Sequence, residues 1–214
     1  IVVISFVRAL LFFCFVLLKT WDLRKRSRYH ELLTSAVIFV LFVNIICWKH
    51  WMTLPAGDEP HYMHIAESLF RDHDVDLRNN YLQSAKLLSD EDRISPQMHT
   101  VAGEHIAKKN IGYPLLLIPF AVTGGYFGVL LFQALCGAVL WLQLHRYLNE
   151  LSGLPKFSLF GSFFILFSPP VINHCFLVYP EILGGLLIIA AIRRVIRFDR
   201  TFYRSIFIFL GIIH

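Results

Sequence analysis

Long apolar runs alternate with short charged segments along most of this sequence. The candidate membrane spans are residues 1–18, 32–48, 126–143, 157–173 and 178–196, with a sixth run that begins near residue 205. A helix needs about 20 apolar residues to cross a lipid bilayer, so the first and fourth runs are marginal in length. The pattern predicts an all-α fold, namely a polytopic transmembrane helix bundle.

Basic residues gather in alternate connections between these runs. They are dense in 19–31 and 193–204, and they also occur in 144–156. Because cytoplasmic loops of membrane proteins are enriched in Lys and Arg, these connections are predicted to be cytoplasmic. Residues 49–110 and 174–177 then lie outside the membrane on the opposite side. The chain is therefore predicted to be a multi-pass integral membrane protein.

The composition agrees with a membrane protein and argues against a soluble one. Of 214 residues, 56% are hydrophobic and 16% are charged, whereas soluble domains carry about 25% charged residues. The formal net charge is +5, but the basic residues cluster at the ends of apolar runs, so no nucleic acid partner is predicted. Both ends of the chain look cut, and we expect residues 1–214 to be one transmembrane domain from the N-terminal part of a longer protein.

The segment 49–125 is predicted to be an outer-surface loop that carries amphipathic juxtamembrane helices. Pro60 is a good first helical residue, with Asp58 or Glu59 as the cap. After it, Tyr62, Ile65, Ala66 and Leu69 recur at helical spacing and predict one apolar face that lies on the membrane. A second short helix, 113–121, is closed off by Thr123-Gly124-Gly125 and is expected to lie flat or re-enter. The stretches between these helices, "RDHDVDLRNNY" and "LSDEDRISPQ", are predicted to be polar loop.

Carboxylates at the outer ends of two apolar runs are the first candidates for chemistry. Asp58 and Glu59 follow the second run. A general base at this boundary can meet both a soluble acceptor and a lipid-borne donor. Partial burial there is expected to tune its pKa toward the working pH. Glu181 begins the fifth run, and a carboxylate in such a run is a functional hypothesis by default. Both positions also fit plain helix caps, and this alternative stays open.

Cationic and metal-binding candidates are weaker. Lys109 can act as a point charge for a phosphate group, but on the residues alone a solvated loop lysine is the better explanation. His61 and His64 stand three residues apart on the predicted helix, which is much less specific than a HExxH motif. The four cysteines form no CxxC pair. The sequence therefore predicts no metal site and no cofactor, and a divalent ion has no support beyond those histidines.

Several of these segments, taken in order, resemble the GT-C-fold glycosyltransferases that use polyprenyl-phosphate sugars. "GDEPHYMHIAESLF" is similar to the first outer loop of this family, which includes protein O-mannosyltransferases and bacterial aminoarabinose transferases of lipid A. "KNIGYPLLLIPFAVTGG" is similar to its flat helix, and "LFSPPVINHCFLVYPEILGGLLIIAAI" to the segment with its second acidic residue. The resemblance covers about 32–200, and the span at 1–18 departs from it because the family's acidic loop usually follows the first span.

The resemblance implies a role for each candidate residue. Asp58 matches the general base, Glu59 its acidic neighbour, and Glu181 the later acidic position near the acceptor or the donor phosphate. Lys109 falls near the position that holds the lipid phosphate in some members. The residues expected to contact substrate with it are Tyr62, His61 and Tyr113.

The implied partners are a polyprenyl-phosphate sugar donor, membrane lipids, and a glycan, lipid or protein acceptor. The implied location is the bacterial inner or plasma membrane, with the active site on its outer face. Two further readings remain open at this point. A multi-spanning transporter or lipid flippase would use carboxylates and broken helices for passage, and a non-catalytic membrane subunit would need neither.

Overall fold

The computed structural model describes residues 28–52, 55–87, 96–101 and 104–212. The predicted span at 1–18 lies outside this part of the chain. The described elements are α2 (Arg28–Met52), α3 (Glu59–Glu67), the π-helical turn η2 (Ser68–Asp72), α4 (Arg78–Leu87), β1 (Met98–Val101), β2 (Glu104–Ala107), α5 (Gly112–Ser152), α6 (Pro155–Leu166), α7 (Pro169–His174) and α8 (Glu181–Ile212). The fold is mostly helical, as expected, with one antiparallel hairpin that pairs Met98 with Ala107.

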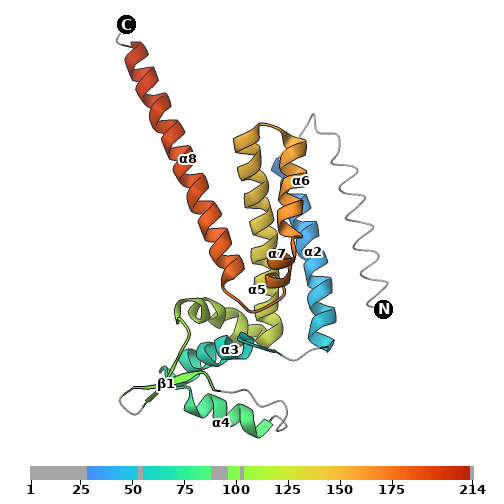
Figure 1. Ribbon diagram of the computed structural model, residues 1–214, viewed down its shortest axis with the longest axis vertical. Helices are drawn as coiled ribbons and strands as arrows, with labels where there is room; N and C mark the ends of the chain where they lie inside the picture. The colour runs from blue at the N-terminus through green and yellow to red at the C-terminus, as the bar shows by residue number, and fades with distance from the viewer. Residues whose placement is uncertain (1–27, 53–54, 88–95, 102–103, 213–214) are drawn as a thin grey trace.

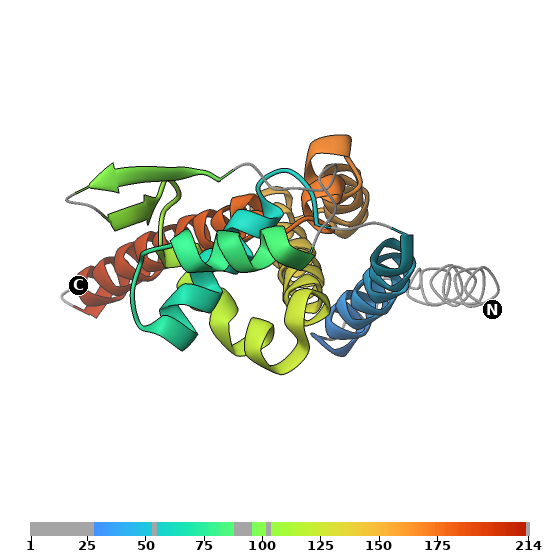
Figure 2. The same ribbon diagram turned by 90° about the horizontal axis from the view of Figure 1, so that it is seen from below.

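Upright helices and a transverse layer make up the architecture (Figure 1). The upright helices are α2, α6, α8 and the second half of α5, which packs against the other three. Across one end lies a layer, here called the lower layer, made of α3, η2, α4, the hairpin and the first half of α5 (Figure 2). The main core lies between the upright helices and includes Phe42, Leu130 and Trp141, each fully buried.

A backbone reversal at Gly125 joins the two halves of α5. Gly125 has φ 57° and ψ −147°, outside the helical region and in a range that favours glycine. Three residues on, a Cβ at Gly128 would lie 2.3 Å from the carbonyl oxygen of Phe120, so only glycine lets the two halves approach this closely. The predicted short helix that closes near Gly125, and the span that follows it, are both confirmed as helices. The upright half continues to Ser152 and ends at Gly153 (φ 64°).

One predicted span and one predicted connection are wrong. The run 157–173 is not one helix, because α6 has 12 residues and stops at Leu166. Ser168 is extended (φ −63°, ψ 141°) before Pro169, and a residue that precedes proline is pushed out of the helical region. Conversely, the predicted cytoplasmic loop 193–204 is helical, since α8 runs unbroken over 32 residues from Glu181 to Ile212.

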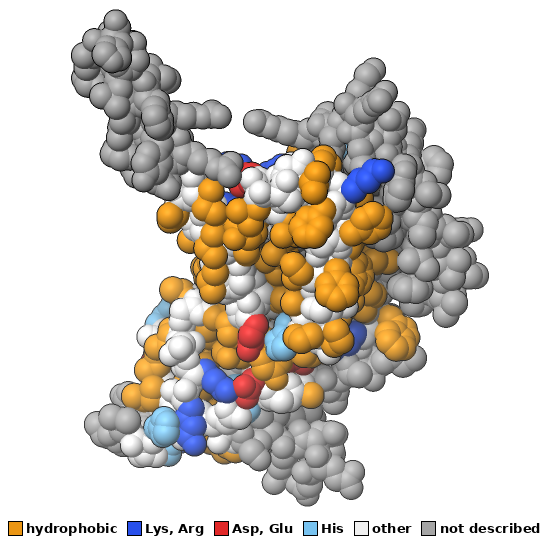
Figure 3. Space-filling view, turned by 45° about the horizontal axis from the view of Figure 1, so that its top comes forward, with side chains coloured by type: hydrophobic (Ala, Val, Ile, Leu, Met, Phe, Trp, Pro, Cys, Tyr) orange, Lys and Arg blue, Asp and Glu red, His pale blue; other side chains and the backbone are white. Residues whose placement is uncertain are grey.

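Within the described residues, two helices are long and apolar enough to cross a membrane: Tyr29–Lys49 and Gly112–Ser152, each with a mean hydropathy of 2.1. Only 39% and 17% of their apolar windows are buried within the described structure, whereas the core helix of a soluble protein would be mostly buried. Exposed apolar side chains on α6 and α8, such as Phe164 and Val195, extend this surface. They form an apolar belt above a charged zone (Figure 3), which is compatible with a lipid-facing surface.

Ion pairs at the end opposite the lower layer connect the upright helices. Arg146 on α5 bonds to Glu31 on α2 at 2.8 Å, and Glu150 receives Arg193 of α8 at 2.6 Å. Arg197 reaches the same carboxylate at 2.5 Å. The basic residues on which the prediction of cytoplasmic connections rests therefore also link α8 and α2 to α5 by ion pairs.

The lower layer differs from its prediction in three ways. The first polar stretch, 71–81, was predicted as loop, yet α4 begins within it; the second, 88–97, lies mostly outside the described residues, and the hairpin that follows it was not predicted. The helix α3 does not expose a polar face, because His61, His64 and Ser68 are buried along with the apolar residues. Asp58 stands at the N-cap, but its side chain forms no capping hydrogen bond. Burial of the polar face follows from Tyr81 of α4, whose ring packs on both histidines.

Candidate functional site

A tight turn places Asp58 at the start of α3. Gly57 has φ 63°, and a Cβ there would lie 2.8 Å from the hydroxyl oxygen of Tyr179. The backbone N–H of Asp58 donates to that same hydroxyl at 3.2 Å. Position 57 therefore requires glycine for two reasons, the left-handed backbone and the close approach of Tyr179. This contact joins the start of α3 to the segment just before α8.

The carboxylate of Asp58 is held from one side and partly open to solvent. Lys109 Nζ lies 2.5 Å from Oδ2, and the side chains are 26% and 30% exposed, respectively. Gln97 Nε2 donates to Oδ1 at 3.3 Å. The hydrogen bond from Lys109 holds the pKa of Asp58 below its ordinary value and outweighs the opposing effect of burial. The expectation that partial burial raises this pKa is therefore wrong, because the effect of Lys109 on the pKa is larger than that of burial.

Glu59, the next residue, is closed off from solvent. Its side chain is 1% exposed, and Lys49 Nζ lies 3.2 Å from Oε1. The backbone N–H of Val178 donates to Oε1 at 2.8 Å, while Tyr126 and the N–H of Ala56 donate to Oε2 at 3.1 and 3.2 Å. Donors from α2, α5, the preceding turn and the segment before α8 thus converge on one buried carboxylate, hereafter the Glu59 network.

This geometry suits a structural role for Glu59 better than proton transfer. Each carboxylate oxygen already accepts two or more hydrogen bonds, and no surface is left through which an acceptor hydroxyl could reach it. A buried charge with many donors is stable only while all of them stay in place. Lys49, which also donates to the carbonyl oxygen of Phe176 at 2.8 Å, fixes the end of α2 to the same point.

Tyrosine rings and one buried glutamine line the region behind Asp58. The ring of Tyr62 makes edge contacts with Tyr113 and Tyr179, at centroid distances of 5.2 and 6.3 Å. Tyr113 donates to Gln133 Oε1 at 3.2 Å, and Gln133 Nε2 donates to the carbonyl oxygens of His174 and Tyr179 at 3.0 and 2.8 Å. Gln133 is fully buried in α5. It fixes the backbone of Tyr179, and through it the turn at Asp58.

Glu181 lies at the same end of the molecule as Asp58. It is the first residue of α8, its side chain is exposed, and among the described residues it forms no ion pair. Burial raises the pKa of the Tyr62 phenol; the charge of Lys109 opposes this shift, and the negative charges of Asp58 and Glu181 add to it. Both carboxylates therefore act on one ring, so the structure brings Asp58, Tyr62, Lys109 and Glu181 into one region.

His61 is connected to Asp58 through the other face of α3. Its Nδ1 lies 2.5 Å from the hydroxyl oxygen of Tyr81, which also accepts the backbone N–H of Gln97 at 3.4 Å. Gln97 in turn donates to Asp58. Burial lowers the pKa of His61, and it lowers that of His64 to about 4. At neutral pH both rings are therefore uncharged. His61 does not face a substrate; it is connected to Asp58 through the hydrogen bonds of Tyr81 and Gln97.

Metal binding finds no support in the described part of the chain. No group of three or more His, Cys, Asp or Glu residues there is arranged to hold a metal ion. His61 and His64, the pair that the spacing singled out, instead pack against Tyr81.

No family model, curated protein or solved structure matches this chain. The site must therefore be interpreted from its own geometry. Sequence reasoning missed Gln97, Lys49, Gln133 and Tyr179, which hold the candidate residues in place. Tyr179 carried a signal, since it immediately precedes the Pro180-Glu181 pair; the other three occur in no recognisable pattern.

Proposed function

We propose that the chain is part of a multi-pass membrane glycosyltransferase that moves a sugar from a polyprenyl-phosphate carrier to an acceptor at the outer face of the membrane. The observation that carries the proposal is the partly open carboxylate of Asp58, paired with Lys109 at 2.5 Å. A base and a phosphate-binding cation in direct contact are the two groups that such a transfer needs. The resemblance of residues 32–200 to the GT-C family supports the same reaction class.

The proposed mechanism begins with the release of Asp58 from Lys109. The phosphodiester of the lipid donor competes for the lysine ammonium, since it carries one negative charge, as the carboxylate does, and its two free oxygens accept hydrogen bonds from the ammonium. Once the lysine turns to the phosphate, the pKa of Asp58 rises toward its ordinary value because its main stabilising hydrogen bond is gone. The carboxylate is then a free base beside the sugar.

Transfer itself is a single displacement at the anomeric carbon. Asp58 takes the proton from an acceptor hydroxyl or amine, whose oxygen or nitrogen forms the new bond to C1 of the sugar. The bond from C1 to the phosphate oxygen breaks, and its electron pair leaves with the lipid phosphate, stabilised by Lys109. One displacement predicts inversion of the anomeric configuration.

The remaining candidates take supporting roles. Glu181 is exposed at the start of α8, where it can bind hydroxyl groups of the acceptor or sugar. Tyr62 and Tyr113 form the buried wall behind Asp58, and His61 supports Gln97 through Tyr81. Glu59 is assigned to structure, as the centre of the Glu59 network.

Transfer from a radiolabelled polyprenyl-phosphate sugar tests the proposal in membranes that carry the whole protein. Asp58→Asn should lower the rate by about 10²-fold or more, because the general base is lost. Lys109→Met should chiefly weaken binding of the lipid-phosphate donor. Lys108→Gln, which changes the neighbouring exposed lysine, is the matched control.

Near-normal turnover by Asp58→Asn would remove this residue from the mechanism. If sugar transfer is absent in all variants, while the wild type carries a lipid or ion across vesicles in an Asp58-dependent way, the transporter reading replaces the proposal.

A further inference from the structure

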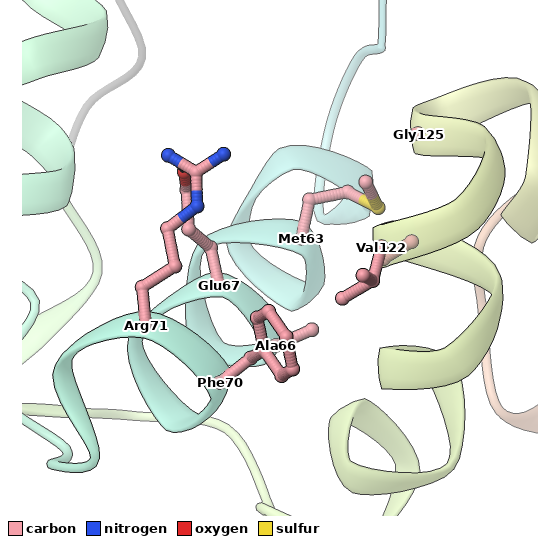
Figure 4. Close-up of a pocket in the computed structure, with 8 residues that line it drawn as sticks. Met63, Ala66, Glu67, Phe70, Arg71, Val122 and Gly125 are labelled. Atoms are coloured by element: carbon pink, nitrogen blue, oxygen red, sulfur yellow. Dashed lines mark ion pairs between the residues drawn. The ribbon is translucent and has the colours of Figure 1, made fainter.

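A hollow lies apart from the Asp58 site (Figure 4). It has a volume of about 270 Å³ and lies between the α3–η2 segment and the turn of α5 at Gly125. None of the residues that hydrogen-bond to Asp58 lines it. Ligand sites for drug-sized molecules have volumes of about 300–1,000 Å³, so this cavity fits only a small group or one end of a larger molecule.

The two sides of the cavity differ in chemistry. On one side Glu67 and Arg71 form an ion pair at 3.0 Å, with side chains that are 35% and 65% exposed. On the other side lie Met63 and Val122, with Phe70 below them (Figure 4). Phe70 and Val122 are 46% and 51% exposed, so the apolar side continues onto the surface. An occupant must therefore be polar at one end and apolar at the other.

The position of the cavity indicates which amphipathic molecule reaches it. Gly125 marks the point where the transverse half of α5 meets its upright, apolar half. In the proposed membrane orientation this is the boundary between lipid and water, where phospholipid headgroups lie. Leu115 and Leu116 on the transverse half are 56% and 52% exposed, as expected for side chains that contact lipid.

The charges of the cavity favour one kind of headgroup. Glu67 and Arg71 together carry no net charge, and their polar ends share one rim. A purely anionic headgroup would be attracted by Arg71 and repelled by Glu67. A headgroup with a phosphate and a primary ammonium matches both side chains, because the phosphate accepts from the guanidinium and the ammonium donates to the carboxylate.

We propose that this cavity binds a zwitterionic phospholipid with an ethanolamine headgroup. The phosphate binds Arg71, the ammonium binds Glu67, and the glycerol and upper chain lie against Met63, Phe70 and Val122. The site is distinct from the donor site at Lys109. It rests on the membrane placement proposed above and does not depend on sugar transfer.

Native mass spectrometry of the purified protein in detergent tests this site. Dioleoyl phosphatidylethanolamine and dioleoyl phosphatidylglycerol, which share their chains and differ in headgroup, are added at equal concentration. We expect about fivefold more retention of the ethanolamine lipid, since two partly exposed charge-assisted contacts distinguish the headgroups. Glu67→Gln and Arg71→Gln should each remove most of this preference.

Two further variants separate binding from folding. Val122→Trp fills the cavity from its apolar side, at a half-exposed position that leaves the ion pair intact, and it should also abolish the preference. Lys108→Gln changes an exposed charge at the same end of the molecule and should retain it. Circular dichroism and size-exclusion chromatography check that each variant folds.

Equal retention of the two lipids by the wild type would overturn the proposal, and so would an unchanged preference in folded Glu67→Gln, Arg71→Gln or Val122→Trp. Lipid retention is measured without any sugar donor, so this result is independent of the activity of Asp58→Asn. Failure of the lipid site and failure of the proposed transferase are thus seen in different experiments.

Discussion

Asp58 and Glu59 are adjacent in sequence but lie in opposite environments. Asp58 is 30% exposed and held by two side chains, from Lys109 and Gln97. Glu59 is 1% exposed and accepts hydrogen bonds from α2, α5 and two backbone segments. One carboxylate can exchange its partners without disturbing the fold, whereas the other holds several elements together.

The contrast shows what separates an accessible acid from an enclosed one in this molecule. Both residues have a lysine within 3.2 Å, so an ion pair alone does not distinguish them. What differs is the number of further donors and the access of solvent. The two carboxylates of this acidic pair therefore lie in different environments, because successive residues on a helix point in different directions.

Loss of the Glu59 network should have the largest effect on stability. Glu59→Ala leaves Lys49 buried without its carboxylate partner, which costs about 3–5 kcal/mol for a buried pair. Thermal unfolding in detergent should therefore show the melting temperature lowered by roughly 10 °C.

The double variant Lys49→Met, Glu59→Met is the control for this prediction. It removes both charges, so it should recover part of the lost stability. If Glu59→Ala melts within a degree or two of the wild type, the network does not hold the elements together and the contrast with Asp58 fails.

The next largest loss of stability should come from low pH, through His64 on the face of α3 that packs against Tyr81. Burial lowers the pKa of His64 to about 4 from an ordinary 6.5, so the unfolded chain binds a proton below pH 6.5 while the folded chain does not. The resulting stability is complete above pH 6.5 and is lost progressively as the pH falls toward 4, by roughly 3 kcal/mol in all. Unfolding measured across this range should show the decline.

His64→Phe tests the assignment, since it keeps an aromatic ring against Tyr81 but cannot bind a proton. This variant should have a visibly flatter pH dependence between 6.5 and 4. An unchanged slope would assign the decline to other groups, such as His61, whose pKa is also lowered by burial.

A smaller effect is expected at the turn that presents Asp58. Gly57→Ala combines a left-handed backbone with a Cβ placed 2.8 Å from the Tyr179 hydroxyl, and should cost about 1–2 kcal/mol for the backbone plus the cost of moving Tyr179. Gly153→Ala is a matched control, because its φ of 64° is nearly the same but nothing lies within 4 Å of the added Cβ. Equal melting temperatures for the two variants would mean that the Tyr179 contact contributes nothing.

The smallest change in stability should come from Asp58→Asn. Its ion pair with Lys109 is partly solvated, and such pairs contribute about 0–1 kcal/mol. The melting temperature should therefore stay within about 3 °C of the wild type. A drop as large as that of Glu59→Ala would show that Asp58 is structural too, and the distinction between the neighbours would be lost.

Much of the fold could be predicted because it depends on local pattern. The apolar runs identified α2 and α8, and the glycines near 124–125 identified the break in α5. The break at Ser168-Pro169 was also visible in the sequence, but the run of apolar residues around it outweighed the proline signal. The helix α4 was missed because its ten residues are largely polar; of its described side chains Asn80 and Tyr81 are buried, and Leu77, just before the helix, packs in one cluster with Tyr81.

The candidate site was predictable only in part. Acidic residues at the ends of apolar runs identified Asp58 and Glu181, because a charge beside such a run needs a reason. The different environment of Glu59 was not predictable, since its partners Lys49, Tyr126 and Val178 lie 10, 67 and 119 positions away. Contacts of that separation are set by packing and leave no periodic trace in the chain.

The lower layer has little apolar interior of its own. Its separate cluster of buried apolar residues consists of Ile65, Leu77 and Tyr81, while Tyr62 and Ala66 belong to the core shared with the upright helices. Excision of this layer as a water-soluble fragment would expose those side chains and separate Glu59 from Lys49. Crystallisation, antibody selection or inhibitor screening aimed at the Asp58 surface should therefore use protein that keeps its upright helices.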